Sequence, residues 1–195
     1  MTDSQNQLFP IFTKIHQLNL LIVGGGNVAE EKLHFLLKNS SAAQATLIAP
    51  QIKAEIRALA EKYGNVKLIQ RKIEDKDLKN RDLILVGTDD AVLNKRLWEV
   101  AKVEKTLVNV ADTPHLCDFY LGSVVTKGDL KIAISTNGKS PTFAKRFRMV
   151  LEEILPDELP EIINQLKSIR DQLKGDFNHK VKRLNEITAG LIEKN

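Results

Sequence analysis

Residues 20–32, "LLIVGGGNVAEEK", decide the fold. Four aliphatic residues end in three glycines, and a helix-like run follows at once. The stretch matches G-x-G-x-x-G/A with Ala29 in the last place, in the strand-to-helix context that the pattern requires. There the first glycine permits a tight turn, the second lets backbone approach a pyrophosphate, and the helix N-terminus offers N–H groups. We therefore predict dinucleotide binding at Gly24, Gly26, Asn27 and Val28; the alternative is a glycine turn needed only for packing.

Strand-like and helix-like segments alternate up to residue 112. Short aliphatic runs predict buried strands at 18–24, 45–50, 66–70, 82–88 and 107–112. Apolar residues at helical spacing predict helices at 28–40, 52–64 and 90–105. This alternation indicates βαβ units, and so the fold class is α/β, with a Rossmann-type doubly wound parallel sheet at the N-terminus.

The pattern changes after residue 112. Two β-like runs, 122–127 and 130–135, flank Gly128-Asp129, which is a hairpin signal. Helical character then continues almost to the end, with breaks expected at Pro156, Pro160 and Gly175. We expect an NAD-binding domain at 1–112, a β-hairpin dimerisation and substrate region at 113–143, and a C-terminal helical domain at 144–195. Because a lone hairpin buries little surface, a homodimer is the simplest way to cover it.

The composition excludes several classes of protein. The 195 residues are 43% hydrophobic, carry a formal charge of +4, and include a single cysteine, Cys117. A disulfide framework and a Cys-based zinc site are therefore excluded, and a cytoplasmic location is expected. The N-terminus has no signal-peptide pattern, and no apolar run is long enough for a membrane. Dispersed basic residues and few aromatic ones disfavour a nucleic-acid partner.

Other strand ends supply further candidates for cofactor contact. The second strand ends at Ala49-Pro50-Gln51, without the acidic residue that holds a ribose 2′-OH. Pro50 and Gln51 are expected near the cofactor, and NAD versus NADP stays open at this point. Thr88 follows a later strand and is expected to touch the cofactor. Asp89 or Asp90 either contacts the cofactor together with Thr88 or caps the next helix.

Asp112 ends the strand at 107–112, at the edge where the nicotinamide should lie. A carboxylate there could accept a proton or transiently hold a hard cation. The alternative is that Asp112 caps the turn at Thr113-Pro114. His115 and Cys117 lie close in sequence but lack the closed spacing of a structural metal site.

A second strand-to-helix corner, residues 137–148 "NGKSPTFAKRFR", resembles an anion site. Ser140 as N-cap and Pro141 at the first helical position make a strong helix start. The same start aims N–H groups outward, among basic side chains that suit a carboxylate. The basic residues are Lys139, Lys145 and Arg148.

Four stretches in order resemble one family. They are "LLIVGGGNVAEEK", "GTDDAVLN", "VNVADTPHLCDFYLGSVVTKGDLKIAISTNGKSP" and "AKRFRMVLE". Together they are similar to the precorrin-2 dehydrogenase / sirohydrochlorin ferrochelatase family, the dehydrogenase–chelatase part of siroheme synthase. The resemblance covers about residues 8–155 closely.

The resemblance implies NAD-dependent oxidation of precorrin-2 to sirohydrochlorin. In bifunctional members, insertion of Fe²⁺ as a substrate follows. It also implies a homodimer, and it assigns Asp112 to the functional aspartate of both steps, including transient metal contact. The methyltransferase domain fused to some members is not expected in these 195 residues.

The resemblance also extends the substrate-binding candidates to Ser135, Thr136 and Asn137, at the end of the hairpin. Thr136 stands where some members have serine, and Asn137 stands where glycine is usual. Asparagine tolerates left-handed backbone, so the turn should survive. Lys145 stands where arginine is frequent, which would change a bidentate contact into a point charge.

Two rival interpretations remain at this point. An unrelated NAD-linked dehydrogenase would leave residues 109–148 unexplained. A regulatory module would bind NAD tightly without turnover. Within the resemblance, a dehydrogenase without chelatase activity is the further alternative.

Overall fold

The computed structural model describes residues 6–189. Its internal contacts divide the chain into two compact units, with the boundary between Leu121 and Gly122. The outer bounds of the predicted first and last domains, residues 1 and 195, lie outside the described residues.

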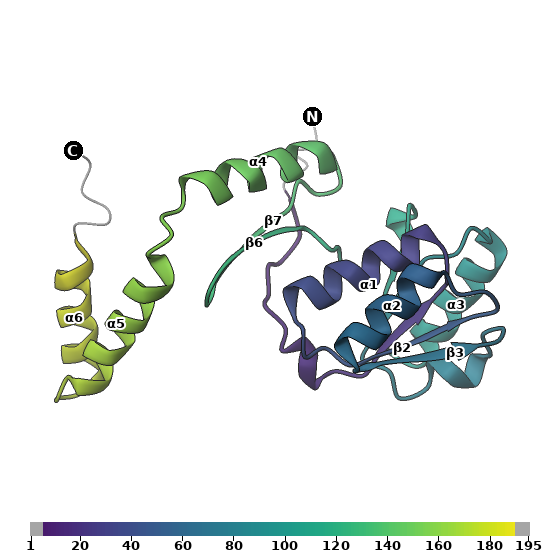
Figure 1. Ribbon diagram of the computed structural model, residues 1–195, viewed down its shortest axis with the longest axis horizontal. Coiled ribbons are helices and arrows are strands. Elements are labelled where there is room, and N and C mark those ends of the chain that lie inside the picture. The colour runs from purple at the N-terminus through teal and green to yellow at the C-terminus, as the bar shows by residue number, and fades with distance from the viewer. Residues whose placement is uncertain (1–5, 190–195) are drawn as a thin grey trace. The chain divides into compact units, whose positions relative to one another are not determined.

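The first unit is built on a five-stranded parallel sheet with the order β3-β2-β1-β4-β5 (Figure 1). The expected Rossmann-type sheet is thereby confirmed. Successive strands are added toward one edge from β1 to β3 and toward the other edge from β4 to β5. The gap between β1 and β4 is therefore the switch point where ligands bind in such folds. The strands are β1 (Leu20–Val23), β2 (Ala45–Ala49), β3 (Val66–Gln70), β4 (Leu83–Val86) and β5 (Leu107–Val110).

Helices cover both faces of this sheet because β1 is apolar on both sides. Leu20 and Ile22 pack in one buried cluster with α1 (Asn27–Asn39) and α2 (Ala54–Tyr63). Leu21 and Val23 pack in the other cluster with α3 (Ala91–Val103). Short 3-10 turns lie between these elements, at η1 (Ile15–Gln17), η2 (Asp75–Leu78) and η3 (Pro114–Leu116).

The second unit contains the expected hairpin and three helices. β6 (Ser123–Lys127) pairs antiparallel with β7 (Leu130–Ile134). α4 (Pro141–Ile154), α5 (Leu159–Gln172) and α6 (Phe177–Thr188) follow. The break expected at Pro160 was wrong: Pro160 lies in the first turn of α5, where the missing N–H has no intrahelical partner to lose.

Helix α4 leaves much of its apolar surface exposed. Phe143 and Phe147 stack on each other with ring centroids 5.8 Å apart, although both are exposed. Met149, Val150 and Ile154 are exposed as well. Over the described residues, none of the helices combines the length and apolar character needed to span a membrane.

Candidate functional site

The glycine corner after β1 is shaped by two close backbone approaches. Gly24 has a φ of +120°, and a Cβ there would lie 2.4 Å from the carbonyl oxygen of Gly87. A Cβ on Gly25 would lie 1.9 Å from the carbonyl oxygen of Gln51. A Cβ on Gly26 would meet no described heavy atom within 4 Å, so this glycine faces open space at the start of α1. The corner therefore fits a pyrophosphate that approaches backbone at Gly26.

Three strand ends lie side by side at this edge. The backbone N–H of Gly87 donates to the carbonyl of Val23 at 2.8 Å, and that of Ala111 donates to the carbonyl of Val86 at 3.0 Å. Gly24, Gly87 and Ala111 thus continue the register of β1, β4 and β5. The glycine corner, Thr88 and Asp112 follow neighbouring strands at the carboxyl edge of one sheet.

Thr88 and Asp90 both serve the start of α3. The Thr88 hydroxyl donates to Asn94 Oδ1 at 2.5 Å, and Asn94 Nδ2 donates back to the Thr88 carbonyl at 3.0 Å. Asp90 caps α3 by accepting from the N–H of Leu93 at 2.9 Å. The capping role considered for Asp90 is therefore confirmed. Thr88 keeps an oxygen lone pair but no free hydroxyl proton for a cofactor.

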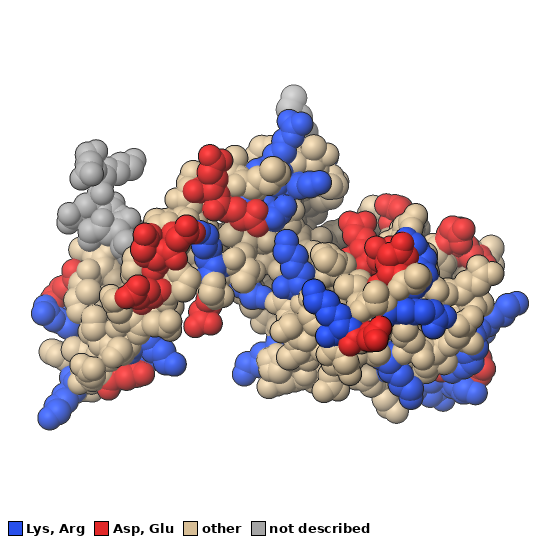
Figure 2. All heavy atoms as spheres, in the orientation of Figure 1, with Lys and Arg blue, Asp and Glu red and all other residues tan. Residues whose placement is uncertain are grey.

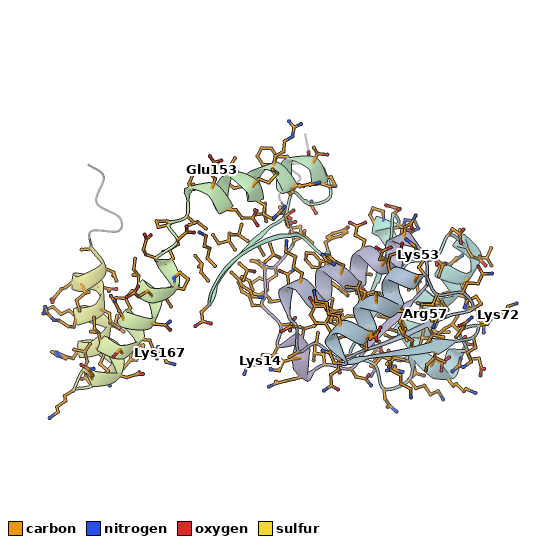
Figure 3. All side chains as sticks on the ribbon, viewed as in Figure 1. Lys14, Lys53, Arg57, Lys72, Glu153 and Lys167 are labelled. Atoms are coloured by element: carbon orange, nitrogen blue, oxygen red, sulfur yellow. The ribbon has the colours of Figure 1, made fainter. Side chains whose placement is uncertain are left out.

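The expected contacts after β2, Pro50 and Gln51, are exposed. Beside them, Lys53 Nζ lies 2.6 Å from Glu30 Oε2 and 2.8 Å from Asn27 Oδ1. Its hydrogen bond to Glu30 raises the pKa of Lys53. Figure 3 shows Lys53 at the start of α2, with Arg57 further along the same helix. The Arg57 guanidinium is bonded in turn to Gln70 Oε1 at 2.6 Å.

Asp112 follows β5 in left-handed backbone, with a φ of +53°. Its carboxylate is exposed and makes no hydrogen bond within residues 6–189. Thr113 instead closes the turn through its own hydroxyl, which donates to the Ala111 carbonyl at 3.0 Å. The capping alternative for Asp112 is therefore not seen, and its oxygens are available to a ligand.

The loop after Asp112 returns along the edge of β5. The N–H of Asp118 donates to the Val108 carbonyl at 2.8 Å, and the N–H of Val108 donates to Asp118 Oδ2 at 2.9 Å. Cys117 lies against the same strand, with Sγ 3.1 Å from the Val110 carbonyl oxygen. Burial raises the pKa of this thiol.

One residue of this region was missed by the sequence analysis. Lys32 extends from α1 to β5, and its Nζ donates to Asn109 Oδ1 at 2.6 Å. Asn109 is only 6% exposed and donates through Nδ2 to the Phe119 carbonyl at 2.8 Å. Burial lowers the pKa of Lys32, and the nearby charges, Asp112 among them, act in the opposite direction. A signal was present: Lys32 lies three residues after buried Ala29 and four before buried Leu36.

The second corner is organised by its own polar side chains. Asn137 and Gly138 have φ values of 54° and 75°, as the two central residues of a type I′ turn do. The N–H of Ser140 donates to Thr136 Oγ1 at 3.1 Å, and the N–H of Asn137 donates to Ser135 Oγ at 3.2 Å. Both hydroxyl oxygens accept within the corner, and both O–H groups remain free to donate to a ligand.

Ser140 caps α4 as expected, because its Oγ accepts from the N–H of Phe143 at 3.2 Å. Lys139 and Lys145 are exposed and form no ion pair with a described residue. Arg148 instead pairs with Glu152, one turn along the helix, at 2.5 Å. The two lysines are thus better placed than Arg148 to take a carboxylate. These residues all belong to the second unit.

Charges of both signs are interspersed on the face of the molecule shown in Figure 2. No group of three or more His, Cys, Asp or Glu side chains in the described part of the chain could hold a metal ion. His115 is exposed on η3, which begins at Pro114.

Two family models match the chain. Residues 11–123 match the model described as "Putative NAD(P)-binding", and residues 127–153 match "Sirohaem biosynthesis protein central". The first model spans the whole parallel sheet, and the second covers β7 and all but the last residue of α4. The two matches meet close to the boundary between the two structural units.

Curated relatives share the same description. A siroheme synthase of Pseudoalteromonas atlantica is 37% identical over 91% of this chain, and one of Vesicomyosocius okutanii is 37% identical over 94%. The chain spans 38% and 39% of their lengths. Among solved structures, SirC, a precorrin-2 dehydrogenase, matches with a TM-score of 0.73 and 27% identity. That match covers 92% of this chain and 89% of SirC.

Proposed function

Because the chain belongs to the NAD(P)-binding family whose model covers residues 11–123, we propose that it oxidises precorrin-2 to sirohydrochlorin with NAD. The relatives named as siroheme synthases and the likeness to a precorrin-2 dehydrogenase over both units support this substrate. The observation that carries the proposal is the shared edge of β1, β4 and β5. It brings the glycine corner and the unpaired carboxylate of Asp112 to one side of one sheet.

The residues present fit a bound dinucleotide. Gly24, Gly26, Asn27 and Val28 would hold its pyrophosphate at the start of α1, where open space and N–H groups meet. Pro50, Gln51 and Thr88 would contact the parts of the dinucleotide on either side of the pyrophosphate. When bound, the nicotinamide supplies a hydride acceptor, and the protein supplies placement.

The charges beside β2 favour NAD over NADP. A 2′-phosphate needs a free cation near the end of this strand. Lys53 is already bonded to Glu30, and Arg71 makes two 2.7 Å contacts with the carboxylate of Asp77. With these two cations neutralised, a 2′-phosphate would have to recruit Arg57, whose guanidinium is bonded to the neutral amide of Gln70.

Asp112 is the group to which we assign proton transfer. Loss of a hydride and a proton from the tetrapyrrole requires a base at the reacting carbon or nitrogen. The Asp112 oxygens make no internal hydrogen bond and so are free for this task. Left-handed backbone costs an aspartate about 1 kcal/mol, and such a cost is commonly kept where it aims a functional group.

The second corner is assigned to the carboxylates of the substrate. Lys139 and Lys145 would contribute unpaired charge, and Ser135, Thr136, Asn137 and Ser140 would donate hydrogen bonds; Arg148 would act only after release from Glu152. We also propose a homodimer through residues 113–143 and the adjoining α4, where stacked Phe143 and Phe147 stay exposed. We retain the proposed division into an NAD-binding domain at 1–112, a dimerisation and substrate region at 113–143 and a helical domain at 144–195.

Insertion of Fe²⁺ into sirohydrochlorin is proposed as a second activity. Asp112 would hold the ion briefly as it passes to the macrocycle, which suits a single hard ligand. Weak binding is appropriate, because Fe²⁺ is a substrate to be released. We place the protein in the cytoplasm, with no nucleic-acid or membrane partner.

The test is an anaerobic assay with precorrin-2 and NAD, in which sirohydrochlorin is followed by its absorbance. The wild-type chain should turn over, and Asp112→Asn should reduce kcat about a hundredfold, the usual scale of general base catalysis, while still binding NAD. Glu104→Gln, in the turn that leads into the opposite end of β5, is the matched control and should retain wild-type rates.

Addition of Fe²⁺ or Co²⁺ to the product tests the second activity. Metal insertion above the spontaneous rate supports it, and insertion at the spontaneous rate leaves a dehydrogenase alone. Tight NAD binding without any oxidation would favour a regulatory module and overturn the proposed function.

A further inference from the structure

We propose that Lys32 is a positioning residue for the dehydrogenation, acting through Asn109 and on the carboxylate of Asp112. The inference rests on the proposed function. It concerns the last residue of the stretch 20–32, to which the glycine motif assigns no role, and this cation comes from a different element than the residues it serves.

The geometry links α1 to the end of β5. Lys32 Nζ and Asn109 Oδ1 are 2.6 Å apart, although 77 positions separate the residues in sequence. The Asn109 amide also donates to the Phe119 carbonyl at 2.8 Å, in the loop that returns from Asp112. The buried amide of Asn109 in β5 therefore forms hydrogen bonds with both α1 and the loop that returns from Asp112. Asn109 lies three residues before Asp112.

An exposed salt bridge does not explain this lysine. Its ammonium is largely buried, and burial of a cation costs free energy unless partners compensate. The titratable groups that act on it are, from the largest effect to the smallest, Cys117, Glu31 and Asp112. The thiol of Cys117 is held as a neutral group by its own burial, and Glu31 is exposed to solvent.

Attraction by Lys32 gives Asp112 a preferred direction. The carboxylate has no hydrogen bond to hold it, and so it would otherwise rotate freely at the rim of the sheet. The ammonium is fixed at β5 by Asn109, three residues before Asp112, and its charge restrains the carboxylate and offsets the carboxylate's charge when an acidic substrate approaches. The consequence is an oriented base in the bound complex, and orientation acts on kcat.

The experiment removes the charge of Lys32 with two different neutral side chains and keeps it with a third substitution. Lys32→Gln and Lys32→Met both remove the charge, and two variants are used because one of them could fail to fold. Lys32→Arg keeps the charge. Lys38→Gln, an exposed lysine on the same helix, is the control. Each protein is measured for Tm, for NAD affinity, and for kcat and KM with precorrin-2.

We expect the folded neutral variants to lose roughly tenfold or more in kcat, with NAD affinity unchanged, and Lys32→Arg to stay within about threefold of wild type. Wild-type kcat in a neutral variant would overturn the inference, as would equal losses in Lys32→Arg and the neutral variants. Loss of Tm and NAD affinity in step with kcat would show a purely structural role and would also overturn it. No turnover by the wild-type chain would remove the proposed function itself, and the inference with it.

Discussion

At the scale of single residues, the site depends on which charges are already satisfied. Arg148 was expected to bind substrate carboxylates, and Lys53 lies beside the expected cofactor contacts, but each has a carboxylate partner, Glu152 and Glu30 respectively. The Arg148 pair is an i,i+4 neighbour and could have been read from helical spacing. The Lys53 pair joins residues 23 positions apart and required the fold. Asp112, in contrast, keeps its carboxylate free.

The ion pair at Lys53 gives a prediction about cofactor choice. Glu30→Gln should remove the shorter of the two ion pairs of Lys53 and leave only Glu55 at 3.7 Å. The ratio of NADP to NAD affinity should then rise roughly three- to tenfold, as expected for one partly exposed charge. Isothermal titration with both dinucleotides measures it. Glu61→Gln, on the exposed side of α2, should leave the ratio unchanged. An unchanged ratio in Glu30→Gln as well would mean that Lys53 does not face the ribose.

The thiol of Cys117 gives a prediction about pH. Its pKa is raised by burial, so the unfolded chain loses this proton first as the pH increases. Stability contributed by the neutral thiol is therefore present below the ordinary thiol pKa and is lost as the pH rises above it. Alkylation of the native protein at about pH 8.5 should be much slower than alkylation of the urea-unfolded chain. Equal rates in both states would show that the thiol is not protected by the fold.

At the scale of elements, turns and caps follow local rules and were predictable. The hairpin at Gly128-Asp129 and the Ser140-Pro141 helix start appear as expected, and the cap at Asp90 is one of the two alternatives left open by the sequence. Each depends on a few neighbouring residues with fixed backbone preferences. The need for glycine at position 25 was not predictable in the same way, because it arises from the carbonyl of Gln51 on another segment.

The turn before α4 can be tested through stability. Asn137→Ala should lower the free energy of unfolding by about 1 kcal/mol, because alanine tolerates a positive φ less well, whereas Asn137→Gly should maintain or raise it. Urea unfolding followed by circular dichroism gives both values. Asn164→Ala, at an exposed position within α5, is the control and should cause no such loss. Equal stability of Asn137→Ala and Asn137→Gly would contradict the assigned turn.

At the scale of the whole molecule, the architecture could be predicted from the sequence more completely than the site could. Alternation of buried strands and amphipathic helices was enough for the parallel sheet, and the resemblance to the siroheme synthase family is confirmed by the matches to both units. The link between Lys32 and Asn109 was out of reach, since no local pattern pairs positions 77 residues apart. The two glycine-containing corners lie in different units, which is consistent with separate cofactor and substrate tasks.

The most direct test of the central claim is the yield of NADH when the wild-type chain is mixed with precorrin-2 and NAD without oxygen. If the edge formed by β1, β4 and β5 is a hydride-transfer site, absorbance should show one NADH for each precorrin-2 converted to sirohydrochlorin. Binding of NAD with no NADH formed, or sirohydrochlorin formed without NADH, would contradict the account.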